Sequence, residues 1–156
     1  MRKLDQSELT ALTAPLVSLQ AWGSELGGVG SMMTVEFGDR TVDSDGFVHG
    51  AWHLWIVMAA WRWETDDQVL AGSENDRTEL KTALPGLNGD AFQRVHVDAV
   101  SLETVFEFTR SRLVTLPIYS RNQADLSLES WMLWTPDGSV IVADPDQGIV
   151  LREQAR

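Results

Sequence analysis

The chain has 156 residues, of which 44% are hydrophobic and 22% charged, with a formal net charge of −11 and no cysteine. This composition is typical of one globular domain spanning residues 1–156, and the lack of cysteine excludes disulfides, thiolate nucleophiles and cysteine-ligated metals. Because phosphate binding depends on Lys and Arg, the acidic balance argues against nucleic acid and anionic membranes and favours a basic protein partner.

The first predicted element is a short helix over residues 4–14. Asp5 is expected to be its N-cap, Glu8 stands three residues later as in a capping box, and Pro15 ends the helix. No apolar stretch suited to a signal peptide follows the start, and the longest mainly apolar run, 51–61, is too short to cross a bilayer. A cytoplasmic location is therefore expected.

Strands are expected to make up most of the remaining chain. They are predicted from alternating apolar residues bounded by turn sequences such as GDR, DSDG and TPDG. The expected strands are Leu16–Trp22, Met32–Phe37, much of 50–64, Phe92–Val100, Glu103–Phe108, Arg112–Ile118, Leu126–Trp134 and Ser139–Ala143. A second helix is expected to start from Ser73 as N-cap, with Asp76 at its third position, and to stop at Pro85.

Residues 50–64, GAWHLWIVMAAWRWE, hold four of the seven tryptophans. Neither alternating face is polar through its middle, which predicts a strand covered on both sides, with most of these tryptophans in the core. A helix is the competing interpretation. A straight strand of this length would reach beyond about 40 Å, so a bend or bulge is expected near Ala59–Ala60.

Two parts of the chain are similar to each other. Placing VEF at 35–37 over FEF at 106–108, an offset of 71 residues, also aligns WETDDQVLA (63–71) with WTPDGSVIV (134–142). The offset predicts two β-units, about 16–71 and 88–143, related by internal duplication, although shared strand–turn patterning would give the same matches. The expected fold is α+β and mainly antiparallel, a twisted sheet or partly closed barrel with two short helices.

Three segments also carry a resemblance to a known family. GAWHLWIVMAAWRWE, LAGSENDR and SWMLWTPDGSVIVADP, in that order, resemble a family of small bacterial proteins that has a WHLW…WR block and a late WMLxTPDG block. The similarity covers residues 30–143. It implies one coherent domain, and because no activity is attached to that family, it implies nothing about function.

Catalytic and cofactor signatures are absent from the sequence. It has no GxSxG or SxxK motif, and GGVG lacks the spacing of a phosphate-binding loop, so no catalytic residue and no cofactor are predicted. No metal site is predicted either, because His49 and His53 would lie roughly 13 Å apart on a straight strand.

Seven residues remain as candidates for binding. Glu36 and Glu107 are lone carboxylates between large apolar residues, at equivalent places under the offset, and would form an acid–base pair if they met in a cavity. Arg62 is expected to form a structural ion pair with a carboxylate such as Glu36 or Glu107, with stacking on an aromatic ring as the alternative. The other candidates are His53, Trp55, Trp61 and Trp134.

The leading functional hypothesis is a non-enzymatic acidic protein that engages a basic protein, such as an immunity-type inhibitor. The alternative is a small-molecule binding barrel whose cavity is lined by Trp55, Trp61 and Trp134. An unrecognised hydrolase using Glu36, Glu107 and His53 is a remote third hypothesis. A homodimer is compatible with all three.

Overall fold

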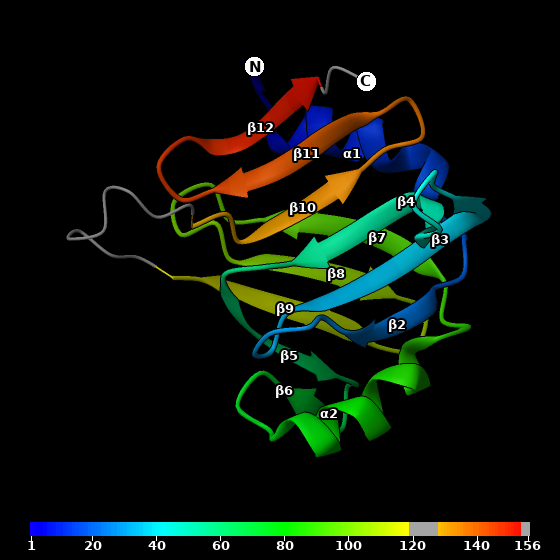
Figure 1. Cartoon of the computed structure of the whole chain (residues 1–156). Coiled ribbons are helices and arrows are strands. Elements are labelled where there is room, and N and C mark those ends of the chain that lie inside the picture. Colours follow the sequence, from blue (N-terminus) through cyan, green and yellow to red (C-terminus); the bar gives the residue numbers. More distant parts are fainter. Residues whose placement is uncertain (119–127, 154–156) are drawn as a thin grey trace.

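Two antiparallel sheets form most of the molecule (Figure 1). The computed structural model describes residues 1–118 and 128–153. The larger sheet has, in order, the strands β1 (Arg2–Lys3), β12 (Gly148–Glu153), β11 (Ser139–Asp144), β10 (Trp131–Trp134), β4 (Val48–Ile56), β3 (Met33–Val42) and β2 (Trp22–Leu26). The smaller has β6 (Val69–Gly72), β5 (Ala59–Glu64), β9 (Arg112–Pro117), β8 (Thr104–Phe108) and β7 (Phe92–Val97).

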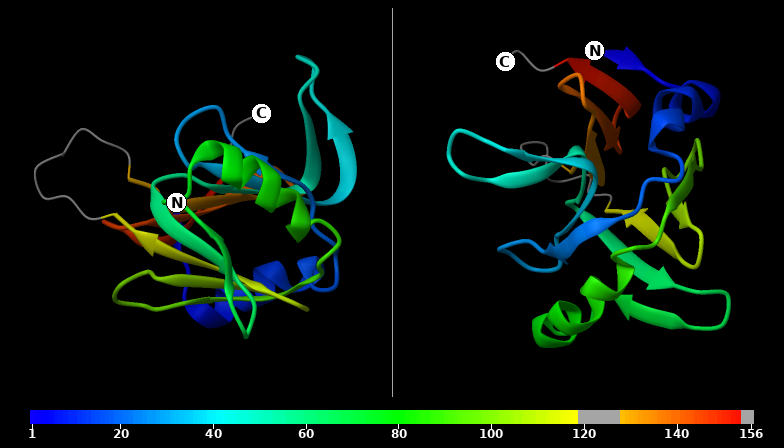
Figure 2. Two further views of the ribbon diagram at one scale, coloured as in Figure 1. Left: turned by 90° about the horizontal axis from the view of Figure 1, so that it is seen from below. Right: turned by 90° about the vertical axis from the view of Figure 1, so that its right-hand side faces the viewer.

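Two short helices accompany the sheets, α1 (Gln6–Thr13) and α2 (Arg77–Ala83), and lie toward opposite ends of the molecule (Figures 1 and 2). Each continues into a 3-10 turn, Ala14–Leu16 or Leu84–Leu87. The expected α+β, mainly antiparallel fold is thus confirmed. The sheets are twisted and open, so the barrel alternative is wrong. No helix in the described ranges is long and apolar enough to cross a membrane.

The facing sides of the two sheets enclose the main core. Phe106 of the smaller sheet meets Trp131 of the larger edge-on, with ring centroids 5.2 Å apart, and Phe37 stacks on Phe108 at 6.2 Å. Trp131 is fully buried, and its indole nitrogen donates to the Thr104 hydroxyl across the sheets. Burial of such large aromatic surfaces stabilises the packing of one sheet on the other.

The stretch 50–64 passes from one sheet to the other. β4 ends at Ile56 and β5 begins at Ala59, so the chain turns at Val57–Met58, slightly earlier than expected. The amides of these two residues donate to Ser130 and Glu129 carbonyls rather than to a neighbouring strand of either sheet.

This turn also reverses which residues face the core. Trp52 and Leu54 are buried before it, whereas Trp61 and Trp63 are buried after it, so even-numbered positions give way to odd ones. Most tryptophans of the stretch lie in the core, as expected. The expectation that β4 is covered on both sides is wrong, because Trp55 is partly exposed on the outer face.

Several expected strand boundaries also differ. The segment 16–22 is not a strand, because Ser18 adopts a left-handed φ of 73° that interrupts an extended chain, and β2 begins only at Trp22. β10 begins at Trp131, and part of its predicted range, residues 126–127, lies outside the described residues. After the last expected strand, the chain forms one further strand, β12.

The two helix starts test the capping predictions. At α1, Asp5 accepts from the amide of Glu8 and the Glu8 side chain accepts from the amide of Asp5, so the predicted capping box is confirmed. At α2 the N-cap is Asp76, and the prediction of Ser73 is wrong. The Ser73 hydroxyl instead accepts from the amide of Trp61.

We expect Asp76→Ala to lower the free energy of unfolding by about 1 kcal/mol, because the amide of Glu79 loses its acceptor. Urea unfolding would measure the change. Asp67→Asn in the exposed 65–68 turn is the matched control and should change the midpoint little. Equal effects of the two substitutions would contradict the assigned cap.

The offset of 71 residues extends to the helices, which the expected units did not include. Asp5 and Asp76 are both N-caps, and Leu9 and Leu80, the residues four positions later, are both buried. The strand pairs show the same offset. Leu26 lies opposite Met33 in β2–β3, and the residues 71 positions later, Val97 and Thr104, lie opposite each other in β7–β8.

The two halves meet at an isolated bridge between Gln20 and Ala91, residues that are themselves 71 apart. Around this bridge the backbone bonds are exchanged: the amide of Ala21 donates to Asp90, and that of Phe92 donates to Leu19. Equivalent positions therefore exchange partners, as in an arrangement about a local twofold axis. A duplicated origin of the halves stays a prediction.

Candidate functional site

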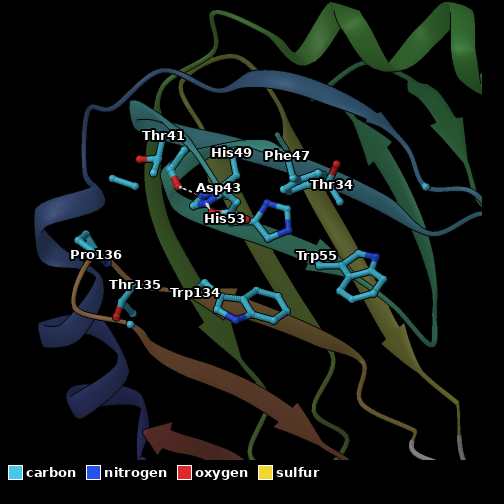
Figure 3. A pocket seen from close by; sticks show the side chains of 14 residues that line it. Thr34, Thr41, Asp43, Phe47, His49, His53, Trp55, Trp134, Thr135 and Pro136 are labelled. Atoms are coloured by element: carbon cyan, nitrogen blue, oxygen red, sulfur yellow. Dashed lines mark hydrogen bonds and ion pairs between the residues drawn. The ribbon is translucent and has the colours of Figure 1, made fainter. Parts of the chain in front are cut away.

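A groove of about 670 Å³ lies on the outer face of the larger sheet, over β3, β4 and β10 (Figure 3). It is formed by side chains that alternate with the core residues of the same strands. On β4, His53 and Trp55 point outward into the groove while Leu54 between them is buried. The far end of the β3–β4 hairpin stands out from the body of the molecule (Figure 2).

Strand register brings the groove residues together. His53 on β4 lies directly opposite Glu36 on β3 and Trp134 on β10, and Trp55 lies opposite Thr34. Side chains opposite one another in antiparallel strands share a face with Cβ atoms about 5 Å apart. Three strands from distant parts of the sequence thus contribute to one surface.

Five aromatic rings form a continuous belt along this surface, which we call the aromatic belt. Its members are Trp55, Trp134, His53, Phe47 and His49. The ring of Trp134 lies 6.2 Å from Trp55 and 5.3 Å from His53. The centroid of Phe47 lies 6.2 Å from that of His53 and 6.0 Å from that of His49. The belt presents aromatic surface along one side of the groove.

A buried carboxylate orients His53. Glu36 is only 4% exposed, and its two oxygens lie 2.7 and 2.6 Å from Nδ1 of His53. One of these oxygens also accepts from the amide of Gly50 at 2.8 Å. Because a carboxylate only accepts, Nδ1 carries the hydrogen and the ring is fixed in one orientation.

His49 lies much closer to His53 than a straight strand allows, with ring centroids 6.3 Å apart. The β3–β4 register shifts between Phe37 and Arg40, and such a bulge bends the hairpin. The expectation that the two histidines are far apart is therefore wrong. Within the described residues, no group of three or more His, Asp or Glu is placed to hold a metal ion.

Both ring nitrogens of His49 have an acceptor at 2.8 Å, Nδ1 the carbonyl of Gly50 and Nε2 the carboxylate of Asp43. The Gly50 carbonyl and then Asp43 raise the pKa of His49 above its ordinary value, despite the opposing effect of burial. Because the folded-state pKa is the higher one, this stabilisation is fully present below about pH 6.5 and is lost as pH rises through the folded value.

The remaining predicted site residues lie elsewhere. Trp61 is in the core, with its indole nitrogen donating to the Ser31 carbonyl, so it does not line the groove. Glu107 is on β8 of the other sheet, bonded to Arg94, and does not meet Glu36. Arg62 forms an ion pair, as expected, but its partner is Glu64 rather than Glu36 or Glu107.

The outer face of the smaller sheet differs chemically from the groove. It carries a row of ion pairs across neighbouring strands: Arg94 with Glu107, and Arg112 with Glu64 at 2.7 Å. Burial would raise the pKa of Glu64, but the guanidinium groups of Arg62 and Arg112 outweigh it and hold that pKa below its ordinary value. The guanidinium groups in this row are thus already paired within the chain.

Sequence reasoning missed the hairpin's part of the site. Asp43 was expected to form a turn, and Phe47, Thr41 and Gly50 were not singled out. Phe47 carried a usable signal, since a large aromatic residue stood between a turn sequence and a histidine.

No family model matches the chain, and no curated protein or solved structure is significantly similar to it.

Proposed function

We propose that this chain is a non-enzymatic binding protein and that the groove engages a basic protein partner, taking up one of its cationic side chains. The observation that carries the proposal is the aromatic belt in company with the carboxylate of Asp43. Aromatic faces attract cations within about 6 Å of the ring, and a carboxylate adds a charged acceptor.

Charge distribution supports the same choice. The chain carries a net charge of −11, and the described residues that line the groove include no Lys or Arg. Arg62, Arg94 and Arg112 lie instead on the other sheet, engaged in ion pairs. A cationic partner would therefore be attracted by the whole molecule and would meet no Lys or Arg among the described residues that line the groove.

A blocked pentapeptide that alternates glycine and arginine is the defined probe, with citrulline in place of arginine as its neutral control. We expect the arginine peptide to change the tryptophan fluorescence and to bind more weakly as salt rises from about 0.05 to 0.5 M. Trp134→Ala should weaken binding about tenfold, because one face of the belt is lost.

Leu116→Ala is the matched control, because it removes an exposed apolar side chain from β9, outside the groove. It should leave the affinity unchanged, and circular dichroism would establish that both variants are folded. Equal binding of the citrulline peptide, or equal affinities of the two variants, would contradict the proposal.

A small-molecule binding site is the second candidate, favoured by the volume of the groove. About 670 Å³ falls within the range of small-ligand sites, roughly 300–1,000 Å³. Such a site would bind neutral aromatic compounds with little dependence on salt. The same fluorescence titration, repeated with indole and at both salt concentrations, separates this function from binding of a basic partner.

A further inference from the structure

One corner of the groove is arranged to hold a cation. Each ring nitrogen of His49 faces an acceptor oxygen, and only the doubly protonated imidazolium donates from both. The ring of Phe47 stacks on it at 6.0 Å with an angle of 25° between the planes. In that doubly protonated form, the positive charge lies against an aromatic face, with Asp43 at its edge.

Among the groups that face His49 in this corner, the charged ones other than histidine are carboxylates. Asp43 faces it from the 43–46 turn and Glu36 from β3, while His53 lies on its own strand. From β10 and the turn after it, the groove lining receives Trp134 and Thr135, which are uncharged. The negative charges are therefore on Asp43 and on Glu36, and Glu36 is bonded to His53.

We propose that this corner is a guanidinium subsite: an arginine side chain of the ligand takes the place of the His49 imidazolium against Asp43 and Phe47. The inference rests on the proposed function and names its ligand group. On binding, His49 gives up its proton to solvent, and the guanidinium donates the hydrogen bonds to Asp43. The exchange keeps one cation in the corner before and after binding.

The shape of the corner selects arginine over lysine. A guanidinium is planar like an imidazolium, so it can stack on Phe47 while donating from its edge to Asp43 and to the Gly50 carbonyl. An ammonium is a compact point charge that cannot stack in this way. The lysine version of the pentapeptide should therefore bind more weakly than the arginine version.

The test is the affinity of the arginine pentapeptide as a function of pH. Between about pH 5.5 and pH 8.5 the affinity should rise at least tenfold. The protonated form of His49 competes with the arginine, and one pH unit below even an ordinary histidine pKa it outnumbers the neutral form about ten to one. Calorimetry in buffers of different ionisation enthalpy should show a proton released on binding near neutral pH. His49→Gln, which keeps a side-chain donor but cannot become a cation, should bind with nearly constant affinity.

Asp43→Asn should remove most of the arginine preference, whereas Asp67→Asn, with the same change of net charge outside the groove, should retain it. No binding of the peptide to the parent chain at any pH would overturn the proposed function itself. Binding that is independent of pH, equally dependent on pH in His49→Gln, or equal for lysine and arginine would overturn only the guanidinium subsite.

Discussion

Gly50→Ala is expected to destabilise the chain by about 3 kcal/mol or more, beyond the usual cost of overpacking, because the added methyl group would meet backbone atoms that cannot rotate away. A Cβ at this position would overlap the backbone oxygen of Phe37 and would lie 2.8 Å from its nitrogen and 2.9 Å from the Trp52 oxygen. Phe37 and Trp52 are both buried, so neither strand can move outward without opening the core.

The same substitution should remove ligand binding in whatever fraction still folds. The amide of Gly50 donates to Glu36, which binds His53, and the carbonyl of Gly50 accepts from His49. The placement of both histidines therefore depends on the backbone of this one residue. Urea unfolding and the arginine-peptide titration together measure the two effects. Gly28→Ala is the control, since no heavy atom lies within 4 Å of its Cβ position. Equal midpoints for the two variants would contradict the expected overlap.

Local chemistry made much of the fold predictable. The capping box at Asp5 and Glu8 depends on neighbouring residues alone, and so does the antiparallel alternation of Met33, Val35 and Phe37, all of which are buried. The second cap was misplaced because Ser73 and Asp76 are both good N-caps. Only the tertiary bond from the Trp61 amide to Ser73 decides between them.

The groove was less predictable because it depends on two departures from regular strands. The turn at Val57–Met58 places Trp61 in the core and leaves Trp55 outside, which a single alternating pattern cannot indicate. The bulge between Phe37 and Arg40 then brings His49 near His53. Both irregularities are set by how strands pair across the molecule, and the sequence signals them only weakly.

The 71-residue offset predicted similar places for Glu36 and Glu107, but not their different surroundings. Each lies in an antiparallel strand pair: Glu36 is opposite His53 in β3–β4, and Glu107 is opposite Arg112 in β8–β9. Glu36 is covered by the bent hairpin and meets a histidine, whereas Glu107 remains partly exposed and meets an arginine. Equivalent sequence positions thus provide a natural comparison between a buried and an exposed carboxylate.

Glu36→Ala is therefore expected to lower the free energy of unfolding by about 2–4 kcal/mol, and Glu107→Ala by less than about 1 kcal/mol. The first substitution leaves the Gly50 amide and Nδ1 of His53 without an acceptor in a buried setting, whereas the second breaks an exposed ion pair. Urea midpoints at equal slope would give both values.

Glu36→Gln separates the hydrogen bonds from the charge. Its amide oxygen can still accept from the Gly50 amide and from Nδ1 of His53, but its NH2 group, a donor, replaces the second oxygen beside Nδ1. The loss of stability should therefore be smaller than that of Glu36→Ala. A double-mutant cycle with His53→Ala should give a coupling of about 1–3 kcal/mol, as for other residues in one buried network. A coupling near zero would mean that Glu36 is held by Gly50 alone, and that His53 is free to turn within the groove.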